Sequence, residues 1–88
     1  MVSAKVTVIN PQGMHMRPAQ QFVTAMAPFK SDVTILFGSK TINGKSIMNV
    51  MASCIKQGSE IEIRCEGEEE RQALEAAVKL VESGLGDL

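Results

Sequence analysis

The chain has 88 residues, of which 44% are hydrophobic and 22% are charged, with nine Lys or Arg against ten Asp or Glu. This length supports one hydrophobic core and hence one domain over residues 1–88, and the composition excludes disordered and fibrous proteins. No apolar run approaches the length of a membrane span, so we expect no membrane insertion. Cys54 and Cys65 have neither zinc-site nor disulfide-framework spacing, which favours reduced thiols, a cytoplasmic protein and no metal.

Charge is distributed unevenly along the chain. Residues 1–58 carry six Lys or Arg against Asp32 alone, whereas residues 59–88 carry three Lys or Arg against nine Asp or Glu. An anionic ligand or an acidic partner is drawn to the surface that the first part presents. We therefore expect two surfaces of opposite charge, provided that the fold keeps the two parts separate.

The first third of the chain has the pattern of a strand, a turn and a helix. Alternation of polar and apolar residues over 5–9 predicts a half-buried strand. Residues 10–13, Asn-Pro-Gln-Gly, are those that a type I turn favours. Apolar residues then recur at helical spacing, with Pro18 in the first turn of the predicted helix and Pro28 at its end.

The middle of the chain predicts a hairpin and a short helix. Residues 33–37 and 40–43 have the composition of two strands joined by a tight turn. Ser46 is a favoured N-cap residue and precedes a short helical segment over 47–52.

The last third predicts a strand followed by a long helix. Strict alternation over 60–66 indicates a strand with one face in water. A stripe of apolar residues after Gly67 indicates a helix that ends before Gly84. The resulting order of strands and helices favours a sheet that helices cover on one face.

The only histidine, His15, lies between the predicted turn and the predicted first helix. Gly13 allows a tight turn, and unpaired amide N–H groups at a helix start attract an anion. Arg17 adds a permanent cation whose geometry matches phosphate oxygens. Because imidazole can attack phosphorus, this pattern indicates a phosphohistidine site. The alternative is a histidine that caps the helix beside a surface arginine.

Two segments of the chain resemble one known family. Gly13-Met14-His15-Met16-Arg17-Pro18-Ala19 resembles the active-site signature of HPr, the histidine-containing phosphocarrier family of the bacterial phosphoenolpyruvate-dependent sugar phosphotransferase system. Residues 44–51 resemble the regulatory-serine segment of that family, and the resemblance covers essentially the whole chain. It implies an α+β fold, an open-faced β-sandwich of order βαββαβα, with a four-stranded antiparallel sheet and three helices on one face.

The resemblance implies a phosphoryl carrier that needs no cofactor and is not an enzyme. Nδ1 of His15 would take a phosphoryl group from phosphorylated enzyme I and pass it to enzyme IIA domains. Arg17 and the backbone N–H groups of Met16 and Arg17 would hold the phosphate. Ser46 would be phosphorylated by an HPr kinase/phosphorylase, and the product would act as corepressor with a catabolite-control transcription regulator.

The resemblance also implies a docking surface for these partners. Its residues are Ile47, Met48 and Met51 at the centre, with Gln20 and Lys45 at the rim. Simple core packing is the alternative for the apolar residues, although a six-residue helix cannot bury every side. Members of the family commonly have a small residue where this chain has Met16. The Met16 side chain either narrows access to His15 or widens the docking surface.

Three function classes remain open from the sequence. The first is the sugar-system phosphocarrier, and the second is a regulatory phosphoprotein or nitrogen-branch paralogue. The third is a nucleic-acid binder, which only the basic first part suggests. Three Phe without Trp or Tyr leave few residues for base stacking, so we expect no direct contact with nucleic acid. We further expect a monomer.

Overall fold

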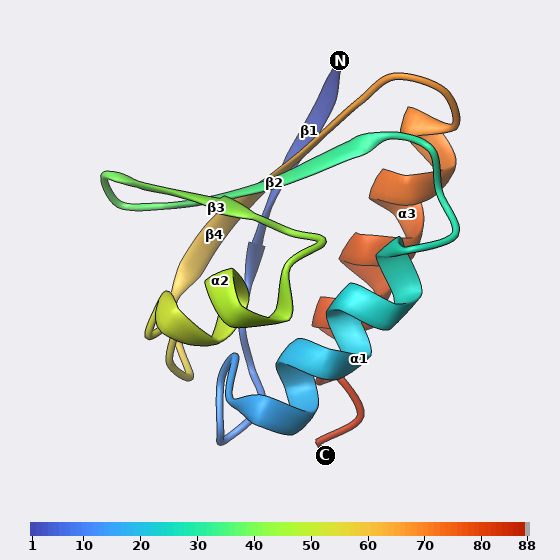
Figure 1. Ribbon diagram of the computed structural model, residues 1–88. Coiled ribbons are helices and arrows are strands. Elements are labelled where there is room, and N and C mark those ends of the chain that lie inside the picture. The colour runs from blue at the N-terminus through green and yellow to red at the C-terminus, as the bar shows by residue number, and fades with distance from the viewer. Residues whose placement is uncertain (88) are drawn as a thin grey trace.

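The computed structural model describes residues 1–87 and combines one four-stranded sheet with three helices (Figure 1). In chain order the elements are β1 (Val2–Thr7), α1 (Met16–Met26), β2 (Asp32–Phe37), β3 (Lys40–Asn43), α2 (Ile47–Ala52), β4 (Glu60–Glu66) and α3 (Glu70–Glu82). The strands lie side by side in the order β1-β4-β2-β3, and every neighbouring pair is antiparallel. The predicted open-faced sandwich of order βαββαβα is confirmed.

The alternation of apolar and polar residues along the strands decides which face of the sheet the helices cover. Every second residue of β4 is buried, and Ile63 lies opposite Ile35 of β2 in the strand register. The helix α3 packs against β1 and β4, while α1 packs against both α2 and α3. Phe22 of α1 is fully buried in the single core cluster between these layers. The buried residues of β4 are Ile61, Ile63 and Cys65.

The boundaries of β1 differ from those that the sequence predicted. Alternation indicated a strand over 5–9, but β1 begins at Val2, which lies opposite Cys65 of β4. Val8 lies beyond the strand, yet it is fully buried and its N–H donates to the carbonyl of Ser59 over 2.9 Å. Pairing with the longer partner strand, rather than local alternation, sets where β1 begins.

The first helix begins and ends close to its predicted boundaries. His15 is the N-cap of α1, and Pro18 lies in the first turn, where its missing N–H leaves no intrahelical bond unmade. The helix ends at Met26, two residues before Pro28. The same polypeptide turn that carries His15 therefore leads directly into the helix.

After α3 the chain turns back toward the start of α1. Gly84 has a φ of +94°, and the N–H of Leu85 donates to the carbonyl of Leu80 over 2.9 Å, as in a Schellman helix ending. The Leu85 side chain is fully buried. Figure 1 shows the C-terminal end of the ribbon beside the first turn of α1. The tail is thus anchored in the core next to the turn that precedes His15.

The expectation of two surfaces of opposite charge is wrong. Lys5 of β1 lies opposite Glu62 of β4 in the strand register, and Lys30 forms an ion pair with Glu68 over 3.6 Å. The strand order explains this mixing, because it inserts the acidic β4 between β1 and β2. The first turn of α1, in contrast, contains no acidic residue.

Candidate functional site

His15 is exposed at the N-cap position of α1. Its backbone is extended, with φ −72° and ψ −174°, and its side chain makes no capping hydrogen bond to the helix. His15 therefore occupies the capping position of the alternative interpretation, but its imidazole does not perform the capping. Its two ring nitrogens remain available for chemistry in solvent.

The amide groups beside His15 form an open donor site. The first intrahelical bond of α1 runs from the N–H of Ala19 to the carbonyl of His15 over 2.8 Å, and Pro18 has no N–H. Within residues 1–87, the N–H groups of Met16 and Arg17 have no hydrogen-bond acceptor. Amide donors at a helix start point out of the helix end and favour an anion there. Within this part of the chain the structure thus leaves two backbone donors free beside His15.

Arg17 supplies the positive charge of this site. Its side chain is exposed on the first turn of α1, and no ion pair occupies it within the described part of the chain. A guanidinium can bind two phosphate oxygens at once through parallel N–H donors. Arg17 and the two free amides together can neutralise and orient a phosphoryl group.

A tight backbone contact holds the turn that precedes His15. Gly13 has a φ of +58°, and its N–H donates to the carbonyl of Asn10 over 3.1 Å, which confirms the predicted turn over residues 10–13. A Cβ atom at Gly13 would lie 2.3 Å from the carbonyl oxygen of Ile55. The next residue, Met14, is buried, and its N–H donates to that same oxygen over 2.9 Å. Only glycine allows this close approach.

Ser46 caps the short helix α2, as the sequence predicted. Its hydroxyl oxygen accepts a hydrogen bond from the N–H of Asn49 over 3.2 Å, and its carbonyl accepts one from Val50 over 3.0 Å. The serine backbone is extended, with φ −113° and ψ 115°. Since the residue is only partly buried, the hydroxyl group lies within reach of solvent.

Exposed apolar side chains gather on the two helices near His15. Met48 is 79% exposed and Met16 is 63% exposed, whereas Val50 on the same short helix is fully buried. These side chains begin on two helices that pack against each other. The exposed position of Met16 favours the interpretation that it widens this surface. We call it the docking surface; it comprises Met16, Ile47, Met48 and Met51.

The two predicted rim residues lie in different places. Gln20 is exposed on α1 and lines a shallow groove together with Arg17. The ammonium group of Lys45 instead donates to the carbonyl of Phe29, which lies beyond the last turn of α1. His15 precedes the first turn of the same helix, so this hydrogen bond draws the ammonium group toward the other end of α1, and the place of Lys45 at the rim stays a prediction. A carbonyl left free past the helix end offers this cation an acceptor.

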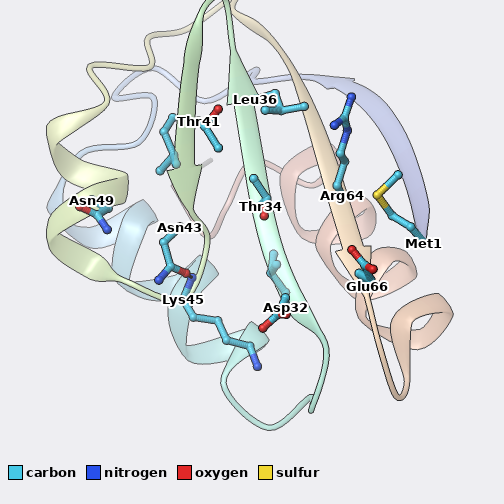
Figure 2. Close-up of a pocket in the computed structure, with 12 residues that line it drawn as sticks. Met1, Asp32, Thr34, Leu36, Thr41, Asn43, Lys45, Asn49, Arg64 and Glu66 are labelled. Carbon is cyan, nitrogen blue, oxygen red and sulfur yellow. Dashed lines mark hydrogen bonds between the residues drawn. The ribbon is translucent and has the colours of Figure 1, made fainter.

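A broad hollow lies over the uncovered face of the sheet, away from His15 (Figure 2). Lys45 stretches along its edge, and Asp32 and Glu66 lie opposite each other on neighbouring strands. None of His15, Met16 or Arg17 lines it. The candidate phosphate site is therefore an exposed surface rather than a cavity, which suits a group that must be reached by other proteins.

The thiols and acidic groups suggest no further centre. Within residues 1–87, no cluster of three His, Cys, Asp or Glu side chains could hold a metal ion, and no helix is long and apolar enough to cross a membrane. Both cysteines are free: Cys54 is exposed and Cys65 is buried. Burial raises the pKa of the Cys65 thiol and keeps it protonated.

Sequence reasoning missed a contact between the turn and the C-terminal tail. The Asn10 side chain is fully buried, and its amide nitrogen donates to the carbonyl of Gly13 over 2.7 Å and to Oδ2 of Asp87 over 3.3 Å. Asn10 was predicted only as a turn residue, and Asp87 had no predicted role. No sequence signal links two residues that lie at opposite ends of the chain.

Known proteins resemble this chain in both sequence and fold. The family model described as PTS HPr component phosphorylation site matches residues 2–83. The phosphocarrier protein HPr of Lysinibacillus sphaericus is 45% identical over 86 residues, which cover 97% of this chain and 98% of that protein.

Solved structures give the same result. The crystal structure of HPr-C-His from Thermoanaerobacter tengcongensis superposes with a TM-score of 0.95 at 34% identity, covering 100% of this chain and 99% of that one. The crystal structure of Crh, a Bacillus subtilis catabolite repression protein described as a dimer with a swapped domain, has a TM-score of 0.77 at 37% identity, with 94% and 95% coverage. This chain therefore belongs to the HPr family, the phosphocarrier proteins of the phosphotransferase system.

Proposed function

We propose that Nδ1 of His15 accepts a phosphoryl group from phosphorylated enzyme I and passes it to sugar-specific enzyme IIA domains in the cytoplasm. The observation that carries this proposal is the exposed imidazole at the start of α1, beside two amide donors without acceptors. The protein acts as a carrier and not as an enzyme, because it passes the phosphoryl group from one protein to another and is itself the substrate of both; it does so as a monomer.

The transfer is a displacement at phosphorus. The Nδ1 lone pair of His15 attacks, a P–N bond forms, and the bond between phosphorus and the donor breaks with its electron pair returning to the donor. In the onward step the acceptor attacks and the electrons of the P–N bond return to the imidazole. His15 ends each cycle unchanged.

Arg17 and the amides of Met16 and Arg17 stabilise the charge on the transferred group. The two amides are held in place by the backbone before the reaction, so they need no reorganisation as charge moves toward the phosphoryl oxygens, and Arg17 adds its positive charge. None of them replaces the imidazole as nucleophile. We assign them the binding of phosphate on phosphorylated His15.

Docking brings each partner to the same exposed imidazole. Met16, Ile47, Met48 and Met51 present flexible apolar side chains that can fit more than one partner surface. We assign Gln20 and Lys45 to the rim of this surface, and Gln20 lines a groove together with Arg17. A shared docking surface requires enzyme I and the IIA domains to bind one after the other.

Phosphorylation of Ser46 by an HPr kinase/phosphorylase regulates this exchange. The phosphate places almost two negative charges at the start of α2, next to the exposed Met48 side chain. The charge opposes docking of an acidic enzyme I surface without a large change of shape. The phosphorylated protein then acts as corepressor with a catabolite-control transcription regulator, without touching nucleic acid itself.

Mass analysis after incubation with phosphoenolpyruvate and enzyme I tests the central step. We expect one acid-labile phosphate on the wild-type chain and none on His15→Ala, which changes an exposed side chain that makes no capping bond. Circular dichroism of the variant provides the folding control. An unmodified wild-type protein would rule out the carrier role.

The likeness to Crh supports a second candidate, a purely regulatory phosphoprotein. Adding a sugar-specific IIA domain and its membrane partner separates the two functions. Rapid transfer of the phosphate to sugar supports the carrier, whereas loading of His15 without onward transfer supports the regulator or a nitrogen-branch paralogue.

A further inference from the structure

The C-terminal tail is held in a defined position beside the turn that precedes His15. The buried Leu85 side chain anchors it, and the N–H of Asp87 donates to the carbonyl of Gly84 over 2.9 Å. This short loop directs the Asp87 carboxylate back toward residues 10–13. The tail therefore meets the functional turn as an ordered segment.

One carboxylate oxygen binds two residues of that turn. Oδ2 of Asp87 accepts from the backbone N–H of Gln12 over 3.2 Å and from the side-chain amide of Asn10 over 3.3 Å. The same Asn10 amide nitrogen also donates to the carbonyl of Gly13 over 2.7 Å. Hydrogen bonds to a charged group are stronger than those between neutral groups. We call this set of bonds the tail clasp.

The burial of Asn10 points to a role other than stability. The side chain is fully buried, yet its carbonyl oxygen Oδ1 has no hydrogen-bond partner within residues 1–87. Burying an unsatisfied acceptor destabilises a protein, and an apolar side chain of similar shape would avoid that cost. What Asn10 does provide is the donor pair that joins Gly13 to Asp87.

The tail clasp is continuous with the backbone of His15. Gly13 is pressed against the Ile55 carbonyl, and the N–H of Met14 donates to that carbonyl over 2.9 Å. Met14 is buried, and the next residue is His15. The turn is thus held on one side by Ile55 and on the other by Asp87. Release of either side allows the backbone before His15 to shift.

We propose that Asp87 is a positioning residue for phosphoryl transfer, which acts through Asn10 and Gln12 to hold the backbone before His15 in place. This inference rests on the proposed phosphorylation of His15. Asp87 touches neither the imidazole nor the phosphate site in the structure, so its effect is on the orientation of His15 and not on the docking surface.

The test compares three variants of the full 88-residue chain with the wild type. Asp87→Ala removes the clasp, Asp87→Asn keeps an oxygen that can accept from Gln12, and Asp32→Ala removes the same charge from an exposed strand position. For each protein, rapid-quench kinetics give kcat and KM for phosphorylation by phosphorylated enzyme I. Amide hydrogen exchange of Gly13 and Met14 is measured without any partner.

For Asp87→Ala we expect kcat to fall on the order of tenfold at unchanged KM, since a small misplacement of a reacting group slows transfer strongly. Exchange of the Gly13 and Met14 amides rises by a similar factor, although both keep their own acceptors. Asp87→Asn recovers most of the rate, and Asp32→Ala matches the wild type.

Four results would overturn the inference: unchanged kcat in Asp87→Ala, a change in KM alone, an equal loss in Asp32→Ala, or an Asp87→Asn protein as slow as Asp87→Ala. If the wild type takes up no phosphate at all, the proposed function fails. The exchange measurement then still decides whether Asp87 holds the turn.

Discussion

The N–H of Met14 donates to the carbonyl of Ile55 over 2.9 Å, and this bond fastens the residue before His15 to the segment that follows α2. The same carbonyl oxygen leaves no room for a side chain at Gly13. The turn before His15 and the segment after α2 are therefore held together. A change on either side alters the position of His15.

Substitution of Gly13 should separate these two segments. In Gly13→Ala the new methyl group would lie 2.3 Å from the Ile55 oxygen at a φ of +58°, so the contact must open. We expect the free energy of unfolding to fall by about 2 kcal/mol or more. Denaturant unfolding measures this loss. Gly38→Ala is the matched control, because Gly38 has a φ of +59° with no atom within 4 Å of the added methyl group. Equal losses in both variants would show that the contact with Ile55 contributes nothing.

Arg17 should matter for transfer and not for folding. Arg17→Gln removes the cation beside His15 while retaining a side chain of similar length, and we expect His15 phosphorylation to slow by about tenfold or more. Arg71→Gln is the control, since Arg71 is exposed at the same second position of α3. A filter assay with labelled phosphoenolpyruvate gives both rates. Equal rates for the two variants would show that Arg17 does not bind the phosphate.

Ser46 has two effects that substitution can separate. Ser46→Ala removes the acceptor for the Asn49 N–H, which should lower the free energy of unfolding by about 1 kcal/mol and the melting temperature by roughly 4–8 °C. Ser46→Asp keeps a capping oxygen and hence the stability, but its charge should slow loading by enzyme I on the order of tenfold. Thermal melts and loading rates of both variants test this. A Ser46→Asp protein that loads at the wild-type rate would refute electrostatic regulation.

Substitution of Met48 should weaken binding to enzyme I, whereas substitution of Val50 should lower stability, although both residues belong to the same short helix. Met48 is 79% exposed, so Met48→Ala should change stability by less than about 0.5 kcal/mol while raising the KM for enzyme I roughly tenfold. Val50 is fully buried, so Val50→Ala should cost about 2 kcal/mol of stability with little effect on KM. Steady-state kinetics and denaturant unfolding of both variants provide the comparison. A Met48→Ala protein with an unchanged KM would exclude Met48 from the docking surface.

Glu70 should contribute to the loss of stability in acid. A hydrogen bond from the Gly67 N–H and the ion pair with the Met1 amino group, at 3.2 Å, hold the pKa of its carboxyl below the ordinary value of 4.5. A lowered folded-state pKa means that this stabilisation is present above pH 4.5 and is lost as the pH falls below that value. Glu70→Gln should therefore flatten the acid side of the stability curve. Denaturant midpoints from pH 2 to pH 7 measure the slope. Curves that stay parallel at every pH would contradict the assignment.

Much of the fold could be predicted because its elements carry local signals. Alternation over 60–66 identified β4, and the Ser46 hydroxyl identified the start of α2, since both effects act between near neighbours in sequence. The beginning of β1 was not predictable in the same way. Val2 belongs to the strand because it lies opposite Cys65, a residue that is far away in the sequence.

The same division applies to the functional site. His15 and Arg17 lie within one short motif, so their spacing on a helix start was visible in the sequence. The position of Lys45 was not, because its ammonium group binds a carbonyl 16 positions earlier that becomes free only where α1 ends. The contact between Asn10 and Asp87 likewise depends on how the tail returns after α3. Such contacts follow from the assembled fold and leave no local pattern.

The position of β1 at the edge of the sheet has a consequence for biosynthesis. Its neighbour in the sheet is β4, whose residues 60–66 are translated more than fifty residues after the end of β1. During most of translation this strand has no partner in its own chain, and its backbone groups remain unpaired. We therefore expect a nascent chain that is stalled before residue 60 to remain sensitive to proteases, because its first strand has no strand to pair with.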